Sequence, residues 1–269
     1  MKILSGKELV GFIKERQALV VAAMKQKPKL VIIRDNDDPV IAKYVNLKKC
    51  YGEDIGVEVT DVVTDEVKAA ILAANEDTSV SGIIVQLPLQ KGPEGLKGRE
   101  VTDNLVSLIA PEKDVDGLSG KGKFESATAT AINWLLTGYN IDLASKKIAM
   151  VGYGRLVGAP LVKMWRNSGL DVTVFEKQDD LNKLVEFDLV VSATGVPRLI
   201  RPELVRAGAT IVDAGTASEN GVLVGDVAEK VRKREDLNAI TPIIGGVGPL
   251  TVGVLFDNVI RASQDYQNF

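Results

Sequence analysis

Short runs of apolar residues, each about the length of one buried strand, alternate with helix-length segments along most of this chain. The first series has expected strands at 30–33, 57–63 and 82–86, with helical segments between them. A strand that is apolar on both faces needs cover on both faces, and crossover helices provide this cover in parallel sheets. The pattern therefore predicts a parallel α/β unit in the first part of the chain.

A second series of the same kind fills the later part of the chain. A charged loop at 111–117 precedes it, and this shift in composition marks a domain boundary. The second series predicts another parallel α/β unit, of Rossmann type. Its expected elements are helices at 127–139 and 156–167, strands at 147–151, 171–175, 189–192 and 209–213, and a final helix at 250–264.

Local signals predict where the first helices begin and end. Ser5 and Glu8 have the spacing of a capping box, which predicts a long first helix. Asp38 followed by Pro39 predicts the start of the second helix, because aspartate is a good N-cap and proline suits the first helical position. Gly56 predicts the end of that helix.

The chain contains no histidine. Mechanisms that need imidazole, such as Ser-His-Asp catalysis and most catalytic zinc sites, are therefore excluded. A proton donor or acceptor must be Lys, Asp, Glu, Tyr or Cys. With 33 basic and 36 acidic residues the net charge is −3, and no basic run marks a surface for nucleic acid or an anionic membrane. We expect small-molecule partners and no metal.

The sequence also suggests a compartment. No apolar stretch approaches the roughly 20 residues of a membrane span, and the N-terminal residues carry charge too early for a signal peptide. Cys50 is the single cysteine, so no intramolecular disulfide forms. These features lead us to expect a cytoplasmic protein.

A glycine-rich turn, Gly152–Gly158, follows the expected strand at 147–151 and opens a helix. In this setting the backbone can approach a pyrophosphate, and the N–H groups of the helix N-terminus attract negative charge. The last glycine stands one residue later than in G-x-G-x-x-G, and glycines that only let a helix pack on a strand explain the same residues. Small residues at Ser192–Gly195 and Asp213–Gly215 favour a dinucleotide across the carboxyl edge of the sheet.

Tyr44 and Lys48 stand four residues apart, so they share one face of a helix. A lysine in a partly desolvated cleft can have a lowered pKa and act as an acid or base near neutral pH. An amphipathic helix with solvated lysines explains the same spacing. Gln86 ends an expected strand and precedes Leu87 and Pro88, which puts an amide at the ligand-binding edge. A strand-end amide that is merely hydrogen-bonded is the alternative.

Two loops complete the set of candidates. Asp114 and Asp116 lie in the charged loop, where turn capping and solvation are the usual roles of aspartate. The segment 243–251 holds three glycines and a proline. Glycine loses more conformational entropy on folding than other residues, and a simple connector does not need three glycines. This segment is therefore predicted to face a ligand.

Together these segments resemble the bifunctional methylenetetrahydrofolate dehydrogenase/methenyltetrahydrofolate cyclohydrolase family over nearly the whole chain. The resemblance depends on six motifs that occur in the family's order. They are Tyr44-Val45-Asn46-Leu47-Lys48, Gly82–Leu89, Lys113-Asp114-Val115-Asp116-Gly117, Val157–Pro160, Val224-Gly225-Asp226-Val227, and Thr241-Pro242 running into Gly245–Val252.

The resemblance implies an α/β fold of two domains with a cleft between them. The catalytic, folate-binding domain would comprise residues 1–125, joined by a C-terminal helix at 250–269, and the Rossmann-type NAD(P)-binding domain would comprise residues 126–249. The implied reactions are oxidation of methylenetetrahydrofolate to methenyltetrahydrofolate with NAD(P), and hydrolysis of the methenyl form to formyltetrahydrofolate. A homodimer is also implied.

The family's residue roles carry over to matching positions. The lysine that matches Lys48 is the acid/base, and the residues that match Tyr44 and Gln86 position it and the folate. The aspartate that matches Asp116 binds the pterin. Further substrate contacts are expected from Leu87, Pro88, Gly248 and Pro249. Cofactor contacts are expected from Gly152, Tyr153, Gly154, Arg155, Val157, Gly158, Glu176, Lys177, Ala193, Thr194, Gly195, Gly215 and Thr251.

The chain departs from the family's pattern near the expected cofactor. Tyr153 replaces the arginine of the phosphate turn, and Glu176-Lys177 replaces a histidine and a serine after the second Rossmann strand. An acidic side chain there can accept hydrogen bonds from ribose hydroxyls and repel a phosphate. NAD is therefore expected over NADP, against the commoner family habit. Lys177 and Arg155 offer compensating charge, however, and a solvated Glu176 is the alternative.

Two departures concern other segments: Ala127–Ala131 stands in place of C-T-P-x-G, and Pro39–Ile41 in place of Pro-Ala-Ser. Two further hypotheses stay open at this point. One is a monofunctional dehydrogenase without the hydrolysis step. The other is a catalytically silent folate- or nucleotide-binding protein, against which the retention of the acid/base lysine argues.

Overall fold

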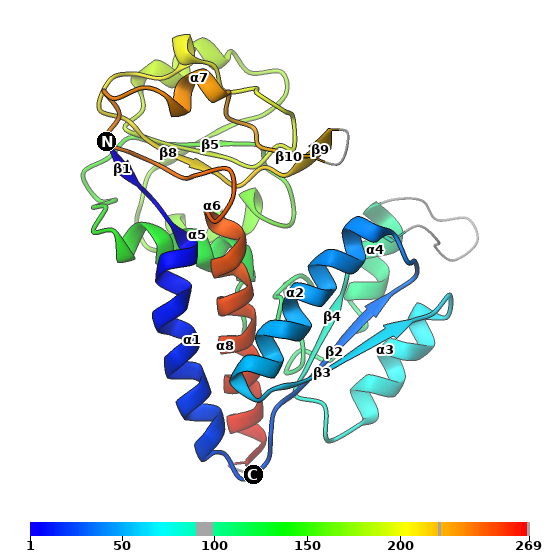
Figure 1. Cartoon of the computed structure of the whole chain (residues 1–269). Helices are drawn as coiled ribbons and strands as arrows, with labels where there is room; N and C mark the ends of the chain where they lie inside the picture. The colour runs from blue at the N-terminus through cyan, green and yellow to red at the C-terminus, as the bar shows by residue number, and fades with distance from the viewer. Residues whose placement is uncertain (90–98, 220–221, 268–269) are drawn as a thin grey trace. The chain divides into compact units, whose positions relative to one another are not determined.

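The computed structural model describes residues 1–89, 99–219 and 222–267. Contacts divide the chain into two compact units. Unit 1 contains Met1–Gly11 and Thr128–Thr251, and unit 2 contains Phe12–Ala127 and Val252–Phe269. The division falls within the two long helices, α1 (Gly6–Ala23) and α8 (Val247–Gln267), which Figure 1 draws in blue and red, and at the first residue of α5 (Ala127–Gly138).

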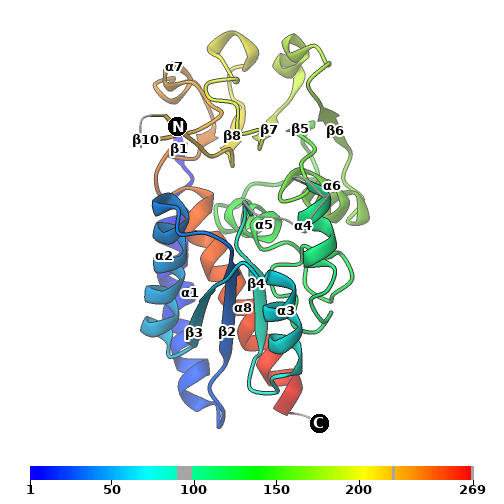
Figure 2. The ribbon, with the colours of Figure 1, turned by 90° about the vertical axis from the view of Figure 1, so that its right-hand side faces the viewer.

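Unit 2 is built on a parallel three-stranded sheet in the order β3-β2-β4 (Glu58–Val63, Lys29–Arg34, Gly82–Val85). Apolar side chains of β2 and β4 pack on one face against α3 (Val67–Glu76) and α4 (Arg99–Val106). The other face carries α2 (Pro39–Ile55), as Figure 2 shows. Here a Cβ on Gly52 would lie 2.5 Å from Val59 Cγ2, so glycine lets α2 approach the sheet. The predicted parallel α/β unit is confirmed.

Three predicted helix ends are also confirmed. Ser5 Oγ accepts a hydrogen bond of 3.2 Å from the Glu8 N–H at the start of α1. Asp38 Oδ1 accepts one of 3.3 Å from the Ile41 N–H at the start of α2. Gly56 ends α2 with φ +82°, in the left-handed region that favours glycine. Local sequence therefore sets these ends.

Unit 1 holds a six-stranded parallel sheet in the order β1-β11-β8-β7-β5-β6. β6 and β7 pair with opposite sides of β5, so the strand order reverses at β5, and such a switch point is where Rossmann-type sheets bind ligands. The strands in sheet order are Lys2–Ile3, Ala239–Ile240, Thr210–Asp213, Leu189–Ser192, Ile148–Val151 and Val172–Phe175.

Helices cover both faces of this sheet. In Figures 1 and 2, α5 (Ala127–Gly138) and α6 (Gly158–Asn167) lie below it and α7 (Glu229–Arg232) lies above it. Two short 3-10 helices, η1 (Leu181–Glu186) and η2 (Pro202–Leu204), pack with α7 in one apolar cluster. The architecture is the predicted Rossmann type.

The structure differs from the predictions at its shortest elements. β1 pairs with β11, so Met1–Gly11 belongs to unit 1, whereas we predicted it within a domain of residues 1–125. Two-residue strands are too short to show a pattern. The antiparallel hairpin of β9 (Ala217–Glu219) and β10 (Val222–Val224) was not predicted either. The last helix, α8, begins at Val247 rather than Leu250.

Candidate active site

Lys48 lies in the middle of α2, with its side chain half-buried. Its Nζ donates a hydrogen bond of 2.7 Å to Oε1 of Gln86, the residue that follows β4. The Gln86 Nε2 donates in turn to the Leu87 carbonyl at 3.0 Å, which orients the amide so that its oxygen faces the lysine. Helix α2 and the end of β4 thus hold the Lys48 amine in a defined position.

Burial lowers the pKa of Lys48, and the negative charge of Asp116 acts in the opposite direction. Desolvation disfavours the charged amine, and it is the larger of these two effects. A lysine whose pKa is closer to neutrality can both accept and release a proton, as a general acid/base must. The structure therefore brings Lys48, Gln86 and Asp116 together.

Tyr44 lies one turn before Lys48 on α2. Its side chain is 39% exposed and makes no hydrogen bond with the residues that the structure describes. The two residues share a helix face, as predicted from their spacing. Leu87 is half-buried and Pro88 exposed just beyond Gln86. Tyr44 is thus one helical turn from the lysine, Leu87 and Pro88 directly follow its partner Gln86, and none of the three is hydrogen-bonded to Lys48 among the described residues.

The loop that carries Asp116 is fixed by its neighbours. Lys113 is buried and donates to three backbone carbonyls at the end of α3, those of Ala74, Asn75 and Asp77. Asp114 is fully buried and accepts hydrogen bonds from the Leu118 N–H and from the N–H and hydroxyl of Ser119.

The rest of this loop is also held from both sides. Val115 is fully buried, and its carbonyl accepts a hydrogen bond of 2.9 Å from Asn258 Nδ2 on α8. Gly117 has φ +66°, and a Cβ there would lie 2.6 Å from the Phe124 carbonyl oxygen. Lys113 and Asp114 therefore have structural roles, whereas Asp116 is half-buried and lies near Lys48.

The glycine turn of unit 1 begins at Gly152, directly after β5. Gly152 has φ +93°, and a Cβ there would lie 2.9 Å from the Ala193 carbonyl oxygen. A Cβ on Gly158, the first residue of α6, would lie 2.0 Å from the Gly152 carbonyl oxygen. A Cβ on Gly154 would meet nothing within 4 Å. The turn is tight on the protein side and open at Gly154, so its backbone fits the pyrophosphate of a dinucleotide.

The other cofactor candidates follow the strands beside β5. Ala193, Thr194 and Gly195 come directly after β7, and Gly215 comes two residues after β8. The Thr194 N–H and hydroxyl both donate to Asp226, a residue of the Val224–Val227 motif to which we assigned no role. That motif was the sequence signal for this missed residue.

Glu176 and Lys177 follow β6 and are exposed. The Glu176 N–H donates a hydrogen bond of 2.7 Å to Asp179 Oδ2, so a second carboxylate lies at the same strand end. Tyr153 is 44% exposed, while Arg155 and Val157 are half-buried. The end of β6 is therefore more acidic than its two predicted residues alone suggested.

The predicted ligand-facing segment at 243–251 is divided between a loop and the first turn of α8. Gly245 has φ +85° and its carbonyl accepts a hydrogen bond from the Lys7 N–H. Gly248 and Pro249 lie in the first helical turn, where proline needs no N–H partner. A Cβ on Gly248 would meet nothing within 4 Å. The Thr251 hydroxyl donates to the Val247 carbonyl at 3.3 Å.

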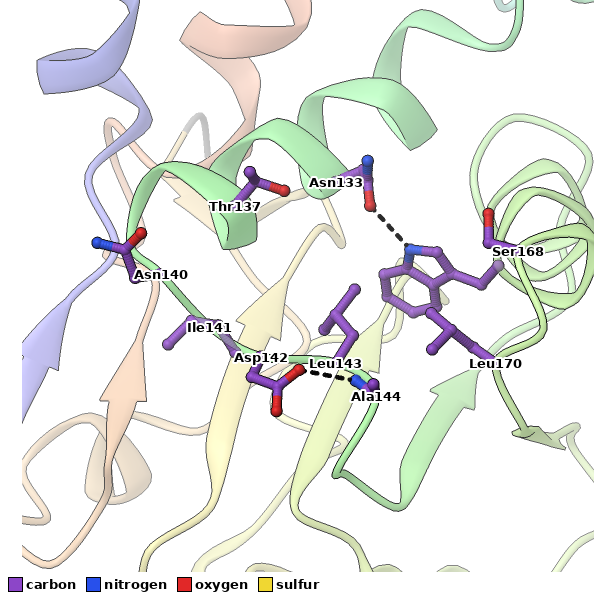
Figure 3. A pocket seen from close by; sticks show the side chains of 10 residues that line it. Asn133, Thr137, Asn140, Ile141, Asp142, Leu143, Ala144, Ser168 and Leu170 are labelled. Carbon is purple, nitrogen blue, oxygen red and sulfur yellow. Dashed lines mark hydrogen bonds between the residues drawn. The ribbon is translucent and has the colours of Figure 1, made fainter.

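A hollow of about 550 Å³ opens elsewhere on unit 1 and contains none of the predicted site residues. Figure 3 shows side chains of α5, α6 and the loops that follow them around it. The Trp165 indole N–H donates to Asn133 Oδ1, and Asp142 accepts from the Ala144 N–H. These polar groups are satisfied within the protein, so the hollow gives no indication of a ligand.

The described residues contain neither a cluster suited to a metal ion nor a helix suited to a membrane span. No group of three acidic or cysteine side chains could hold a metal ion there. No helix in that part of the chain is long and apolar enough to cross a bilayer.

Comparisons with known proteins agree with this arrangement. The family model "Tetrahydrofolate dehydrogenase/cyclohydrolase, catalytic domain" matches residues 4–116, and the model of the family's NAD(P)-binding domain matches residues 126–267. A curated relative, "Bifunctional protein FolD" of Aquifex aeolicus, is 36% identical, with 97% of this chain and 94% of that protein covered. The protein of the same name from Hydrogenobaculum sp. is 38% identical, with 97% and 98% covered.

Solved structures are similar over the same length. The FolD dehydrogenase/cyclohydrolase of Campylobacter jejuni has a TM-score of 0.88 at 32% identity, with 98% of this chain and 99% of that chain covered. The Trypanosoma brucei FolD enzyme, solved with NADP and an inhibitor, has a TM-score of 0.88 at 26% identity, with 99% and 98% covered. This chain therefore belongs to the tetrahydrofolate dehydrogenase/cyclohydrolase family.

Proposed function

We propose that the chain oxidises methylenetetrahydrofolate to methenyltetrahydrofolate with NAD(P) and then hydrolyses the methenyl form to formyltetrahydrofolate. Membership of the family supports both activities. The observation that carries the proposal is the 2.7 Å hydrogen bond from Lys48 to Gln86, with Asp116 acting on the pKa of the same amine. A protein that only bound folate would not need this acid/base lysine.

In the oxidation step, the residues of this chain bind and orient the reactants. When bound, NAD(P) would supply the acceptor for a hydride from the methylene carbon between two folate nitrogens, and the folate product would be a resonance-stabilised cation. The turn from Gly152 to Gly158 would hold the pyrophosphate through its backbone. Asp116 would accept hydrogen bonds from the amino and ring N–H groups of the pterin. No side chain has to transfer a proton in this step.

The hydrolysis step requires a proton to move. The neutral amine of Lys48 would take a proton from the water that adds to the methenyl carbon, and the ammonium would then give a proton to the ring nitrogen that leaves. Gln86 holds the amine, and the negative charge of Asp116 favours the ammonium. Tyr44, on the same helix face, would contact the folate with Leu87, Pro88, Gly248 and Pro249.

An absorbance assay tests this function directly. Purified protein is mixed with methylenetetrahydrofolate and either NAD or NADP, and the methenyl intermediate is followed as it forms and decays. We expect formation with at least one cofactor and decay faster than without enzyme. A methenyl product that decays at its uncatalysed rate would identify a monofunctional dehydrogenase, and no formation with either cofactor would contradict the dehydrogenase assignment.

NAD is proposed as the preferred cofactor. The end of β6 carries the exposed Glu176 and the nearby carboxylate of Asp179, and both charges disfavour a phosphate on the adenosine ribose. Tyr153 stands where the family has an arginine. Lys177 provides one opposing positive charge at the same strand end.

The substitution Glu176→Ser tests this preference. We expect the ratio of kcat/KM for NAD to that for NADP to fall by about tenfold or more, because the variant loses a ribose acceptor and a charge that repels the phosphate. Steady-state rates at low, constant ionic strength measure the ratio, and Glu203→Ser, an exposed glutamate of the same unit, is the control. A wild-type preference for NADP that Glu176→Ser leaves unaltered would show that Glu176 does not contact the ribose.

A homodimer through unit 1 is proposed as well. β6 is an edge strand of the six-stranded sheet, and an edge strand leaves backbone donors and acceptors available to a second copy. Light scattering on the purified protein should give about twice the chain mass of 28.9 kDa. Thr173→Lys, at an exposed position of β6, should weaken the dimer, since charged side chains discourage edge pairing. A wild-type mass equal to one chain would contradict the proposal.

The cytoplasm is the proposed compartment. The free thiol of Cys50 is exposed, which suits a reducing environment.

The predicted cleft between the domains stays a prediction.

A further inference from the structure

Asp226 lies after the β9–β10 hairpin and is only 1% exposed. Asp226 takes no part in either of the two proposed reaction steps. We propose that Asp226 is a positioning residue that holds the loops after β7 and β8 in the shape that binds the cofactor. This inference rests on the cofactor role proposed for Ala193, Thr194, Gly195 and Gly215.

The first contact of Asp226 is with the loop after β7. Its Oδ2 accepts three hydrogen bonds, from the Ser192 hydroxyl at 2.7 Å, the Thr194 N–H at 2.7 Å and the Thr194 hydroxyl at 2.9 Å. These bonds fix the backbone on both sides of Ala193. The Ala193 carbonyl oxygen is the atom that lies 2.9 Å from a Cβ built on Gly152. Asp226 therefore determines the position of the surface against which the glycine turn packs.

The second contact is with the loop after β8. A Cβ on Gly215 would lie 1.9 Å from Asp226 Oδ1, so the backbone of this loop runs directly against the carboxylate. Asp213, the last residue of β8, accepts hydrogen bonds from the N–H groups of Gly215 and Asp226, both at 3.1 Å. The Asp226 carboxylate thus contacts the loops after both strands. The Asp213 carboxylate in turn accepts a hydrogen bond from the backbone N–H of Asp226.

This arrangement buries charge at a cost to stability. Asp213 forms an ion pair with Arg232, and burial raises the pKa of Asp213 while it lowers that of Arg232. Asp226 Oδ1 and Arg232 Nε have no hydrogen-bond partner among the described residues. Buried polar atoms without a partner are rare in native proteins because they carry a desolvation penalty. Apolar side chains would fill this space with a smaller desolvation penalty. The presence of the carboxylate therefore indicates that its hydrogen bonds are needed to keep the two loops in their shape.

The substitution Asp226→Asn tests the proposal, with Asp188→Asn as its matched control. Asp188 lies before β7, at the opposite end of the same strand, where it accepts from the Lys147 N–H and from Arg206. Both variants lose one negative charge that accepts hydrogen bonds. In the first variant the amide would keep the shape of the carboxylate but accept more weakly from three donors, because charge-assisted hydrogen bonds are roughly twice as strong as neutral ones.

Three measurements separate positioning from general stability: calorimetric binding of NAD and of NADP, the cofactor-free rate of methenyl hydrolysis, and the thermal unfolding midpoint. We expect Asp226→Asn to raise the Kd by about tenfold or more for whichever of NAD and NADP the wild type binds. The rate of methenyl hydrolysis should stay within about twofold of the wild-type rate. Asp188→Asn should lower the unfolding midpoint without changing the cofactor Kd. Ser192→Ala, which removes one donor at a fully buried position, should raise that Kd by a few-fold and carries the test if Asp226→Asn does not fold.

Each result is decisive. An unchanged Kd in the folded Asp226→Asn protein, or in Ser192→Ala where that variant carries the test, would overturn the positioning role. So would an equal rise in Kd for Asp188→Asn, because the effect would then be general destabilisation. If the wild-type protein bound neither NAD nor NADP, the proposed function itself would fail, and this inference with it.

Discussion

Replacing Lys48 with methionine should reduce the rate of methenyltetrahydrofolate hydrolysis by at least about 100-fold. Methionine has a similar length but cannot carry a proton, so the attacking water loses its base and the departing ring nitrogen loses its acid. Folate binding should persist, because the pterin contact is assigned to Asp116. The decay of the methenyl absorbance measures the rate, and calorimetry with the folate substrate measures the binding.

The neighbouring Lys49 provides a matched control. It is exposed on the same helix, so Lys49→Met should leave hydrolysis near the wild-type rate. The wild-type pH profile gives a second check: burial lowers the pKa of Lys48, so hydrolysis should show a titration below the usual lysine range, and Lys48→Met should lose it. Hydrolysis near the wild-type rate in Lys48→Met would rule out the acid/base role.

Replacing Asp116 with asparagine should weaken folate binding by roughly 2–5 kcal/mol, which corresponds to roughly 30-fold to several thousand-fold in Kd. Asparagine has the same size but turns one acceptor into a donor. That donor would face the amino and ring N–H donors of the pterin, and the mismatch is the reason for the large effect. Calorimetric titration of the variant with the folate substrate measures the loss.

The same variant has an effect on proton transfer. The charge of Asp116 raises the pKa of Lys48, so its removal should lower that pKa further and move the titration in hydrolysis to lower pH, measured at saturating substrate. Glu112→Gln, an exposed carboxylate of the same loop, should change neither quantity. Folate affinity equal to that of the wild type would be incompatible with pterin binding by Asp116.

Much of the fold could be predicted because its signals are local. The apolar runs and helical periodicities depend on residues within one element, and the caps at Ser5 and Asp38 depend on residues three positions apart. The glycine turn at Gly152 is local as well, because its left-handed backbone is a property of one residue. Helix starts such as that of α8 were displaced by a few residues, since proline tolerates the first turn as well as the preceding loop.

The sequence by itself determined the parallel α/β architecture, the position of the glycine turn and, through the resemblance, the identity of the candidate residues. The tertiary structure alone decided that Lys48 contacts Gln86, 38 positions away, and that Asp226 contacts Thr194, 32 positions away. It also decided that β1 pairs with β11, across more than 230 residues. Such contacts depend on the order of the strands in each sheet and on how burial shifts pKa values. Both are properties of the packed chain that no local pattern encodes.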